Sequence, residues 1–269
     1  MPKTLSAWEK VEIARDSTRK TSLDYIEKIC DEFIELHGDR SYGEDASFVC
    51  GLAKINNKNV TIIAQQKGRN TKENMKRNFG MPNPEGYRKA IRLMKQSEKF
   101  GRPIITFIDT KGAYPGIGAE ERGQGEAIAK SMFEMSKLEV PIIAIVIGEG
   151  SSGGALAISV ANKIIMLENA IYSILSPEGY ASILWKDSSR AKEAAEKMKL
   201  TAKDLYNFGI IDSIIKENKK EQNFETIAQE IKKEILKNLT NLEKLSKQEI
   251  LQDRYKKFRN MGEYKEVSK

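Results

Sequence analysis

The spacing of apolar side chains predicts buried strands that alternate with amphipathic helices. Val140–Ile147 is an unbroken apolar run, mostly β-branched, which is typical of a strand buried on both faces of a parallel sheet. Ile104–Ile108 has the same character, and each run leads through a glycine-bearing turn into a helical pattern. This alternation predicts an α/β fold.

Helical spacing, capping residues and turn signals extend the assignment along the chain. Helices are predicted at Ser6–Arg15, Thr21–His37, Asn83–Phe100, Ala119–Met135, Ala155–Ala161, from Ser176, Arg190–Met198, Thr201–Asn207, Glu221–Leu239 and Ser246–Arg259. Strands are predicted at Ser47–Ile55, Val60–Gln65, Ile104–Ile108, Ile142–Ile147, Ile164–Leu167 and Tyr172–Leu175. No long linker interrupts this order, so a single domain, residues 1–269, is expected: N-terminal helices (1–40), a core (41–216) and C-terminal helices (217–269).

The composition narrows the class of protein. With 40% hydrophobic and 31% charged residues the chain is typical of a globular protein, and no apolar run approaches the roughly 20 residues of a membrane span. The first residues lack the apolar core of a signal peptide. Cys30 and Cys50 have no metal-type spacing, which favours a reducing compartment, the cytoplasm. The single histidine, His37, speaks against a histidine-rich metal site, and no metal is expected in this chain.

The net charge of +7 leaves three interpretations open: a solvated basic surface, a polyanionic ligand such as a coenzyme, or RNA. Basic residues are dense between Lys67 and Lys95. Phe79 and Tyr87 are the aromatic residues there, too few for a platform on which single-stranded RNA would stack. RNA binding is therefore not favoured.

The glycine turn after Ile147 is the strongest sign of a site. Gly148, Gly150, Gly153 and Gly154 fall within seven residues, between a buried strand and a helix start. Main-chain N–H groups are unpaired at such a place, and they stabilise negative charge. A close strand-to-helix turn also needs glycine, but four glycines exceed that need. The turn predicts an anion site.

Two familiar anion and nucleophile motifs fit poorly here. Gly150-x-Ser152-x-Gly154 has the form of a serine-nucleophile elbow, but the only histidine precedes it, so a serine hydrolase lacks its base. A phosphate loop starting at Gly148 would need lysine and a hydroxyl residue after Gly153, where Gly154 stands instead.

A dinucleotide fingerprint is equally weak. Gly116-x-Gly118 begins one, but Glu121 stands at the position of the third glycine. Two glycine turns that each end a buried strand remain, and donors of this kind suit an oxygen that becomes charged during a reaction.

The turns lie among motifs that together resemble a known family. The motifs are Gln66–Arg69, Arg77–Pro82, Pro84–Ala90, Phe107–Thr110, Gly112–Gly116, Gly118–Gln124, Ile147–Gly150, Ser152–Ile158, Ser176–Gly179 and Ala181–Lys186. From about Trp8 to the C-terminus the chain resembles the carboxyltransferase α subunit of bacterial acetyl-CoA carboxylase.

The resemblance implies a crotonase-like spiral of ββα units and an α2β2 assembly with a separate β subunit. The implied reaction moves a carboxyl group from carboxybiotin, held on the biotin carboxyl carrier protein, to acetyl-CoA, forming malonyl-CoA for fatty acid biosynthesis. Biotin carboxylase belongs to the wider complex. When carboxybiotin loses its carboxyl group, charge is left on the biotin ureido oxygen. When acetyl-CoA loses a proton, an enolate is left. A site of main-chain donors suits both.

The resemblance also assigns residues. Gly153 and Gly154 are expected to hold the biotin ureido oxygen, with a second donor position in the loop of Gly112 and Ala113. The biotin pocket is expected at Tyr114, Pro115, Gly116 and Ser152, and the vicinity of CoA at Lys67, Arg69 and Arg77. Lys111 stands where the family usually has proline, Ser151 replaces a common glycine, and the family's helical N-terminal arm is largely missing.

Two other classes of function remain as alternatives. A self-sufficient crotonase-type acyl-CoA hydratase or hydrolase would share the fold, but no acid pair is evident for it. An RNA-binding protein is suggested only by the basic balance, and its binding would be sensitive to salt. The family's β subunit carries a zinc ribbon, a site with four metal ligands that the two cysteines of this chain cannot build. The chain is therefore expected to lack the β part and to be inactive alone.

Overall fold

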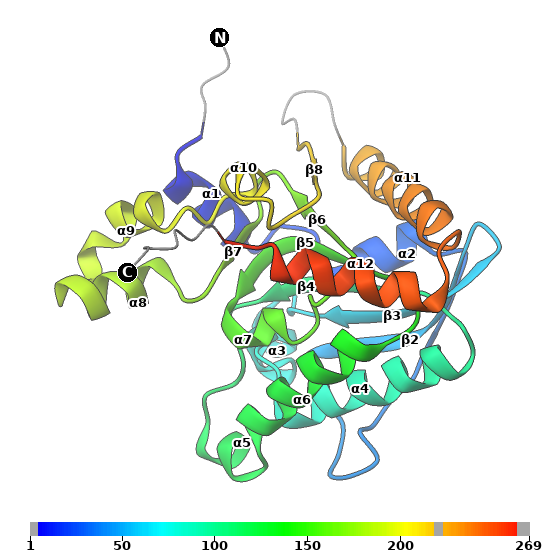
Figure 1. Ribbon diagram of the computed structural model, residues 1–269. Helices are drawn as coiled ribbons and strands as arrows, with labels where there is room; N and C mark the ends of the chain where they lie inside the picture. The colour runs from blue at the N-terminus through cyan, green and yellow to red at the C-terminus, as the bar shows by residue number, and fades with distance from the viewer. Residues whose placement is uncertain (1–4, 218–222, 263–269) are drawn as a thin grey trace, which may run out of the picture.

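A computed structural model describes residues 5–217 and 223–262. In this part of the chain eight strands form one sheet, in the order β1-β2-β3-β4-β5-β6-β8, with β7 paired to β5 beside that path (Figure 1). The strands are β1 (Glu32–Glu35), β2 (Phe48–Ile55), β3 (Lys58–Gln65), β4 (Ile104–Thr110), β5 (Ile142–Ser151), β6 (Lys163–Leu167), β7 (Ile171–Ser173) and β8 (Ser213–Ile215).

Helices cover the sheet and extend beyond it on one side. They are α1 (Ala7–Arg15), α2 (Ser22–Ile29), α3 (Thr71–Lys76), α4 (Pro84–Lys99), α5 (Ile117–Glu121), α6 (Gln124–Lys137), α7 (Ser152–Leu156), α8 (Pro177–Trp185), α9 (Ala191–Met198), α10 (Ala202–Asn207), α11 (Phe224–Leu242) and α12 (Lys247–Arg259), with 3₁₀ turns η1 (Asn78–Gly80) and η2 (Ser188–Arg190). The predicted start of the α11 helix at Glu221 lies outside the described residues.

The sheet is antiparallel at one edge and parallel through its centre. β1, β2 and β3 form an antiparallel meander, and the pairs from β3 through β4, β5 and β6 to β8 are parallel. Every residue of β4 and of β5 is buried. The prediction that Val140–Ile147 marks a strand buried on both faces of a parallel sheet is confirmed.

Two helical layers enclose these strands. Figure 1 shows α4 and α6 side by side below the sheet, with α2 and α11 above it. Tyr87, Leu93 and Met94 lie on the buried side of α4 and are fully excluded from water, as their helical spacing predicts. Because β-branched residues fill β4 and β5, the layers pack on a stiff apolar surface.

The predicted helix Thr21–His37 is wrong beyond Ile29. Cys30 has an extended backbone, and the N–H of Asp31 donates to the Lys54 carbonyl at 2.7 Å. β1 then pairs along β2, and Ile34 at the sheet edge remains 61% exposed. The helical spacing of Phe33 and Leu36 was misleading because strand pairing decided this segment.

Two further helices differ from the prediction. Ala119–Met135 is divided into α5 and α6 at Gly123, whose φ of +81° ends one helix and starts the next. Ala155–Ala161 is replaced by the shorter and earlier α7, because β5 continues through the glycines as far as Ser151. The glycine turn is therefore tighter than the sequence suggested.

Arg254 attaches the last helix to the core. Its Nη1 donates to the carbonyls of Met135 and Leu138 at 2.8 Å each, and its Nη2 to the Val140 carbonyl and Asn162 Oδ1 at 2.9 Å each. Burial lowers the pKa of the Arg254 guanidinium to about 10, so it stays charged at neutral pH. One side chain thus satisfies the carbonyls that end α6 and precede β5.

Replacing this guanidinium should destabilise the protein. We expect Arg254→Met to lower the free energy of unfolding by about 3 kcal/mol or more, since it leaves buried carbonyls without donors. Urea unfolding measures the change. Arg259, exposed on the same helix, provides the control: Arg259→Met should stay within about 0.5 kcal/mol of wild type. Equal effects of both substitutions would contradict this role of Arg254.

Candidate active site

The two glycine turns meet at the carboxyl ends of β4 and β5. A Cβ atom added to Gly154 would lie 2.7 Å from the Ala113 nitrogen and 2.8 Å from the Gly112 carbonyl carbon. Contacts under about 3 Å are closer than a real side chain allows, so only glycine fits at 154. The structure therefore brings together Gly154, Gly112 and Ala113, which the sequence analysis assigned to the two donor loops.

The main-chain N–H groups of the two turns differ in whether they already have an acceptor. The N–H groups of Gly153 and Gly154 belong to the first turn of α7, where no intrahelical acceptor exists, and the preceding Ser151 side chain does not cap them. In the other loop Gly112 N donates to Thr110 Oγ1 at 3.1 Å and Tyr114 N to the Pro82 carbonyl at 2.9 Å.

Ala113 stands between these two engaged residues. Its N–H has no acceptor among residues 5–217 and 223–262. The second donor loop thus offers Ala113 rather than Gly112, a distinction that the sequence alone did not make.

Buried polar side chains hold the two turns in place. Gln65, at the end of β3, donates through Nε2 to the Gly154 carbonyl at 2.7 Å. Thr110 Oγ1 lies 2.6 Å from the Gly80 carbonyl and 2.9 Å from the Gly112 carbonyl. Neither side chain was predicted from the sequence to have a role. Their signal was a polar residue at the carboxyl end of an apolar strand, the place where ligands bind in parallel sheets.

A chain of charged side chains, buried at Asp109 and Glu149 and partly exposed at Arg15 and Glu178, lies beside the turns. Lys67 Nζ is 2.6 Å from Asp109 Oδ1 and 3.4 Å from Glu149 Oε2. Arg15 Nε is 2.9 Å from Glu149 Oε1, and its Nη1 is 2.7 Å from Glu178 Oε1. Asp109 ends β4 and Glu149 lies in β5, while Arg15 comes from α1 and Glu178 from α8. The charges therefore connect the core sheet to the helices at its side.

The charges support one another against the cost of burial. Burial disfavours the ionised form of Glu149, but Lys67 and Arg15 outweigh it, and its pKa lies below the ordinary value of 4.5. Burial likewise disfavours the ammonium of Lys67, but Asp109 and Glu149 outweigh it and raise the pKa of Lys67. Lys67 and Glu149 are therefore both ionised at neutral pH.

The residues predicted to line the biotin pocket occupy two places. Ser152 is exposed, has a φ of +57°, and lines a mostly apolar pocket of about 310 Å³ with Leu156, Tyr172, Ser173, Ile174, Met198, Lys199, Leu205 and Ile210. Tyr114, Pro115 and Gly116 belong to the loop before α5, where Gln124 Nε2 donates to the Tyr114 carbonyl at 2.9 Å. The pocket therefore contains Ser152 but not the other three residues.

The three basic residues predicted near CoA also separate. Lys67 is held between Asp109 and Glu149, as described above. Arg69 is exposed and lies 2.8 Å from Asp24, whereas Arg77 donates to the Ala46 carbonyl at 2.6 Å. They do not converge on one phosphate-sized position, and their contact with CoA stays a prediction.

Two of the three departures from the family pattern, Lys111 and Ser151, lie at the glycine turns. Lys111 is exposed at the rim of a cavity that Lys67 and Asp109 also line, while Gly112 beside it is buried with a φ of +127°. Ser151 has an extended backbone with φ of −116° and needs no glycine. Ser152, rather than Ser151, has the left-handed backbone conformation, with a φ of +57°.

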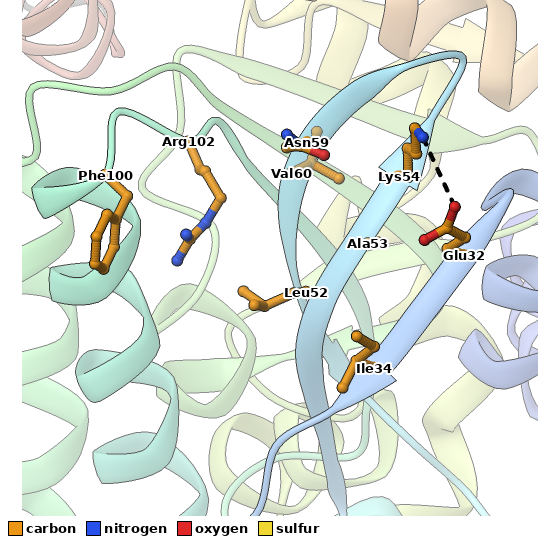
Figure 2. A pocket seen from close by; sticks show the side chains of 9 residues that line it. All are labelled: Glu32, Ile34, Leu52, Ala53, Lys54, Asn59, Val60, Phe100 and Arg102. Carbon is orange, nitrogen blue, oxygen red and sulfur yellow. Dashed lines mark ion pairs between the residues drawn. The ribbon is translucent and has the colours of Figure 1, made fainter.

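A pocket of about 360 Å³ lies away from these turns, at the antiparallel edge of the sheet. Figure 2 shows it between β1–β3 and the end of α4, with the Glu32–Lys54 ion pair on one side and Phe100 and Arg102 on the other. Glu32, Lys54 and Arg102 are its ionisable residues, and Glu32 and Lys54 already pair with each other at 3.7 Å. The glycine turns are thus the better candidate for chemistry.

Residues 5–217 and 223–262 contain neither a cluster of metal-ligand side chains nor a membrane-spanning helix. No group of three or more histidine, cysteine, aspartate and glutamate side chains there is arranged to hold a metal ion. Among the same residues, no helix has the length and apolarity to cross a membrane.

The fold is that of known carboxyltransferases. A transcarboxylase 12S structure matches 85% of this chain and 43% of its own with a TM-score of 0.71 at 20% identity. A Pseudomonas malonate decarboxylase hetero-tetramer in complex with coenzyme A matches 87% of this chain and 92% of its own, with a TM-score of 0.70 at 15% identity. The molecule therefore has the crotonase-like α/β fold shared by these enzymes, as expected.

Sequence comparison specifies the family. The family model described as acetyl co-enzyme A carboxylase carboxyltransferase-like matches residues 1–262, and the chain belongs to that family. It is 57% identical to the "Acetyl-coenzyme A carboxylase carboxyl transferase subunit alpha" of Clostridium acetobutylicum, over 97% of this chain and 96% of that protein. The "subunits beta/alpha" protein of Clostridium tetani is 59% identical, and this chain spans 46% of its length. The predicted family and its class of enzyme, a transferase, are confirmed.

The buried charges predict how stability depends on pH. Because the pKa of folded Glu149 is lowered, its ionisation stabilises the fold above about pH 4.5, and this contribution is lost as pH falls through the folded pKa. We expect wild type to be more stable than Glu149→Gln at neutral pH, with the difference shrinking below about pH 4.5. Urea unfolding of both proteins over that range measures it, and a difference independent of pH would contradict the assignment.

Proposed function

We propose that this chain is the α half of an acetyl-CoA carboxylase carboxyltransferase. It transfers a carboxyl group from carboxybiotin to acetyl-CoA and so forms malonyl-CoA for fatty acid biosynthesis. Membership in the family and the subunit name of its full-length relatives support this role. The observation that carries the proposal is the close approach of Gly154 to Gly112 and Ala113, which brings the two glycine turns together.

The two turns fit a carbonyl oxygen that gains charge during the reaction. The N–H groups of Gly153, Gly154 and Ala113 have the character of such donors, and no side chain at 153 or 154 stands in front of them. Rigid donors aimed at developing charge are worth about 10²–10³ in rate each. Carboxybiotin, when bound, supplies a labile carboxyl group whose departure leaves charge on the ureido oxygen. This chain's residues hold that oxygen and need no nucleophile of their own.

Neighbouring residues give the oxygen site its shape. Gln65 orients the Gly154 peptide, and Thr110 orients Gly112, so both donor loops are fixed before a ligand arrives. The apolar pocket that begins at Ser152 suits the sulfur-containing ring of biotin. Tyr114, Pro115 and Gly116 lie in the opposite donor loop and form the other wall of our proposed biotin site.

The site requires partners. We propose a β subunit that completes it in an α2β2 assembly, a biotin carboxyl carrier protein that delivers the cofactor, and biotin carboxylase in the wider complex. The Clostridium tetani relative supports the first partner, because its name joins beta and alpha subunits in one chain. We place the assembly in the cytoplasm.

Coenzyme A is proposed to bind mainly at the face shared with the β subunit. Arg69 and Arg77 remain candidates for its phosphates, since both are at or near the surface. Lys67 is a weaker candidate because two carboxylates already hold its ammonium.

Adding one methyl group at Gly154 should test the donor site. We expect Gly154→Ala to lower kcat about 10²-fold or more, because the Cβ forces the two donor loops apart while the protein keeps its N–H groups. The assay is the reverse reaction of the chain with its β subunit, carboxyl transfer from malonyl-CoA to a biotin derivative.

Gly125→Ala is the matched control, since a Cβ at Gly125 meets nothing within 4 Å. It should keep wild-type activity. Full activity of Gly154→Ala would contradict the donor role. Turnover of acyl-CoA by the chain without its β subunit would favour a self-sufficient crotonase-type enzyme instead.

A further inference from the structure

The pairing of β4 with β5 changes register just before the two donor loops. Ile108 pairs with Val146, and the next recorded pair is Thr110 with Gly150. Asp109 is therefore the single β4 residue opposite three β5 residues, Ile147 to Glu149. Over this interval β5 has two more residues than β4, which displaces the following β5 residues by about 6–7 Å along the strand relative to β4.

The side chain of Asp109 fills this irregularity. Its Oδ1 accepts a hydrogen bond from the Glu149 N–H at 3.0 Å and lies 2.6 Å from Lys67 Nζ. Gly148 makes the room, since a Cβ there would stand 2.3 Å from the same oxygen and 2.8 Å from Asp109 Cγ. The Asp109 side chain is only 5% exposed, so the carboxylate acts as an internal bridge between the strands.

The displacement decides which residues face each other beyond the strands. Gly112 follows Thr110 by two residues, and Gly154 follows Gly150 by four. With the displacement, Gly154 reaches the Gly112–Ala113 peptide, as the close contacts show. Without it, the β5 turn would be out of step with the β4 loop by about two residues, and the donors would not share one oxygen.

We propose that Asp109, paired with Lys67, is a positioning residue that sets the spacing of the two donor loops. This inference rests on the proposed function, because the loops matter only if they share an oxygen. Asp109 does not touch the reacting atoms. It acts through the β5 backbone at Glu149, and the Lys67 ammonium, 2.6 Å from its Oδ1, holds the carboxylate in place.

The test compares substitutions at Asp109 in the reverse carboxyl-transfer assay of the complete α and β complex. Asp109→Ala removes the acceptor of the Glu149 N–H, and kcat should fall about 10²-fold, as a misplacement near 1 Å costs. The KM for malonyl-CoA should change less than about twofold, because the donors act on charge that develops during reaction. Asp109→Asn keeps an acceptor oxygen and should lose only about tenfold.

Asp212 provides a matched control at the opposite end of the sheet. Its carboxylate likewise accepts a strand N–H, from Ile164 at 2.7 Å, and pairs with a lysine, Lys257. Asp212→Ala should lower the Tm while kcat stays within about twofold of wild type. If Asp109→Ala does not fold, Gly148→Ala serves in its place, since its Cβ displaces the same carboxylate.

Each outcome is decisive. A wild-type kcat for Asp109→Ala, or for Gly148→Ala in its place, would overturn the positioning role. The role would also be overturned if Asp109→Ala and Asp212→Ala both lost kcat in proportion to their loss of Tm, because the effect would then be one of stability alone. An inactive Gly154→Ala beside an active Asp109→Ala would reject the positioning role alone. An active Gly154→Ala would reject the donor role of the two turns, whereas absence of carboxyl transfer by the wild-type α and β complex would reject the proposed function itself.

Discussion

The close approach of two main chains is the constraint on which the site depends. Gly154 touches the Gly112–Ala113 peptide so closely that a single methyl group would not fit. That contact requires β4 and β5 to be parallel neighbours, fully buried and rigid, with their loops at the same edge of the sheet. Side chains from elsewhere, Gln65 and Thr110, then fix the orientation of each peptide.

Charges buried next to this contact are part of the same construction. Asp109 and Glu149 would be costly in the core alone, but Lys67 and Arg15 balance them. The pairs run from the sheet to α1 and α8, so the helices beside the site are tied to the strands that carry the donors. In the function we propose, chemistry based on main-chain donors lets a chain with one histidine contribute to catalysis.

The sequence predicted the central strands well because their apolar runs are long and unambiguous. It failed where distant partners decide the outcome. Residues 32–35 have helical spacing but pair with β2, and β5 extends through glycines because β7 and the Asp109 side chain support it there. Local patterns do not contain such information.

The candidate site was predictable in part for the same reason. The glycine clusters and the family motifs pointed to Gly153, Gly154, Gly112 and Ala113. Only the folded chain shows that Gly112 N is already engaged by Thr110 and that Lys67 faces two carboxylates rather than a ligand. Such distinctions depend on which hydrogen bonds form, and many sequences with the same glycines could form others.

A structure of the α and β complex with a bound biotin derivative would show whether the two loops share one oxygen. We expect the ureido oxygen to lie within about 3.2 Å of the main-chain nitrogens of both Ala113 and Gly154. An ureido oxygen bound elsewhere, with these two nitrogens facing water or the β subunit, would contradict it.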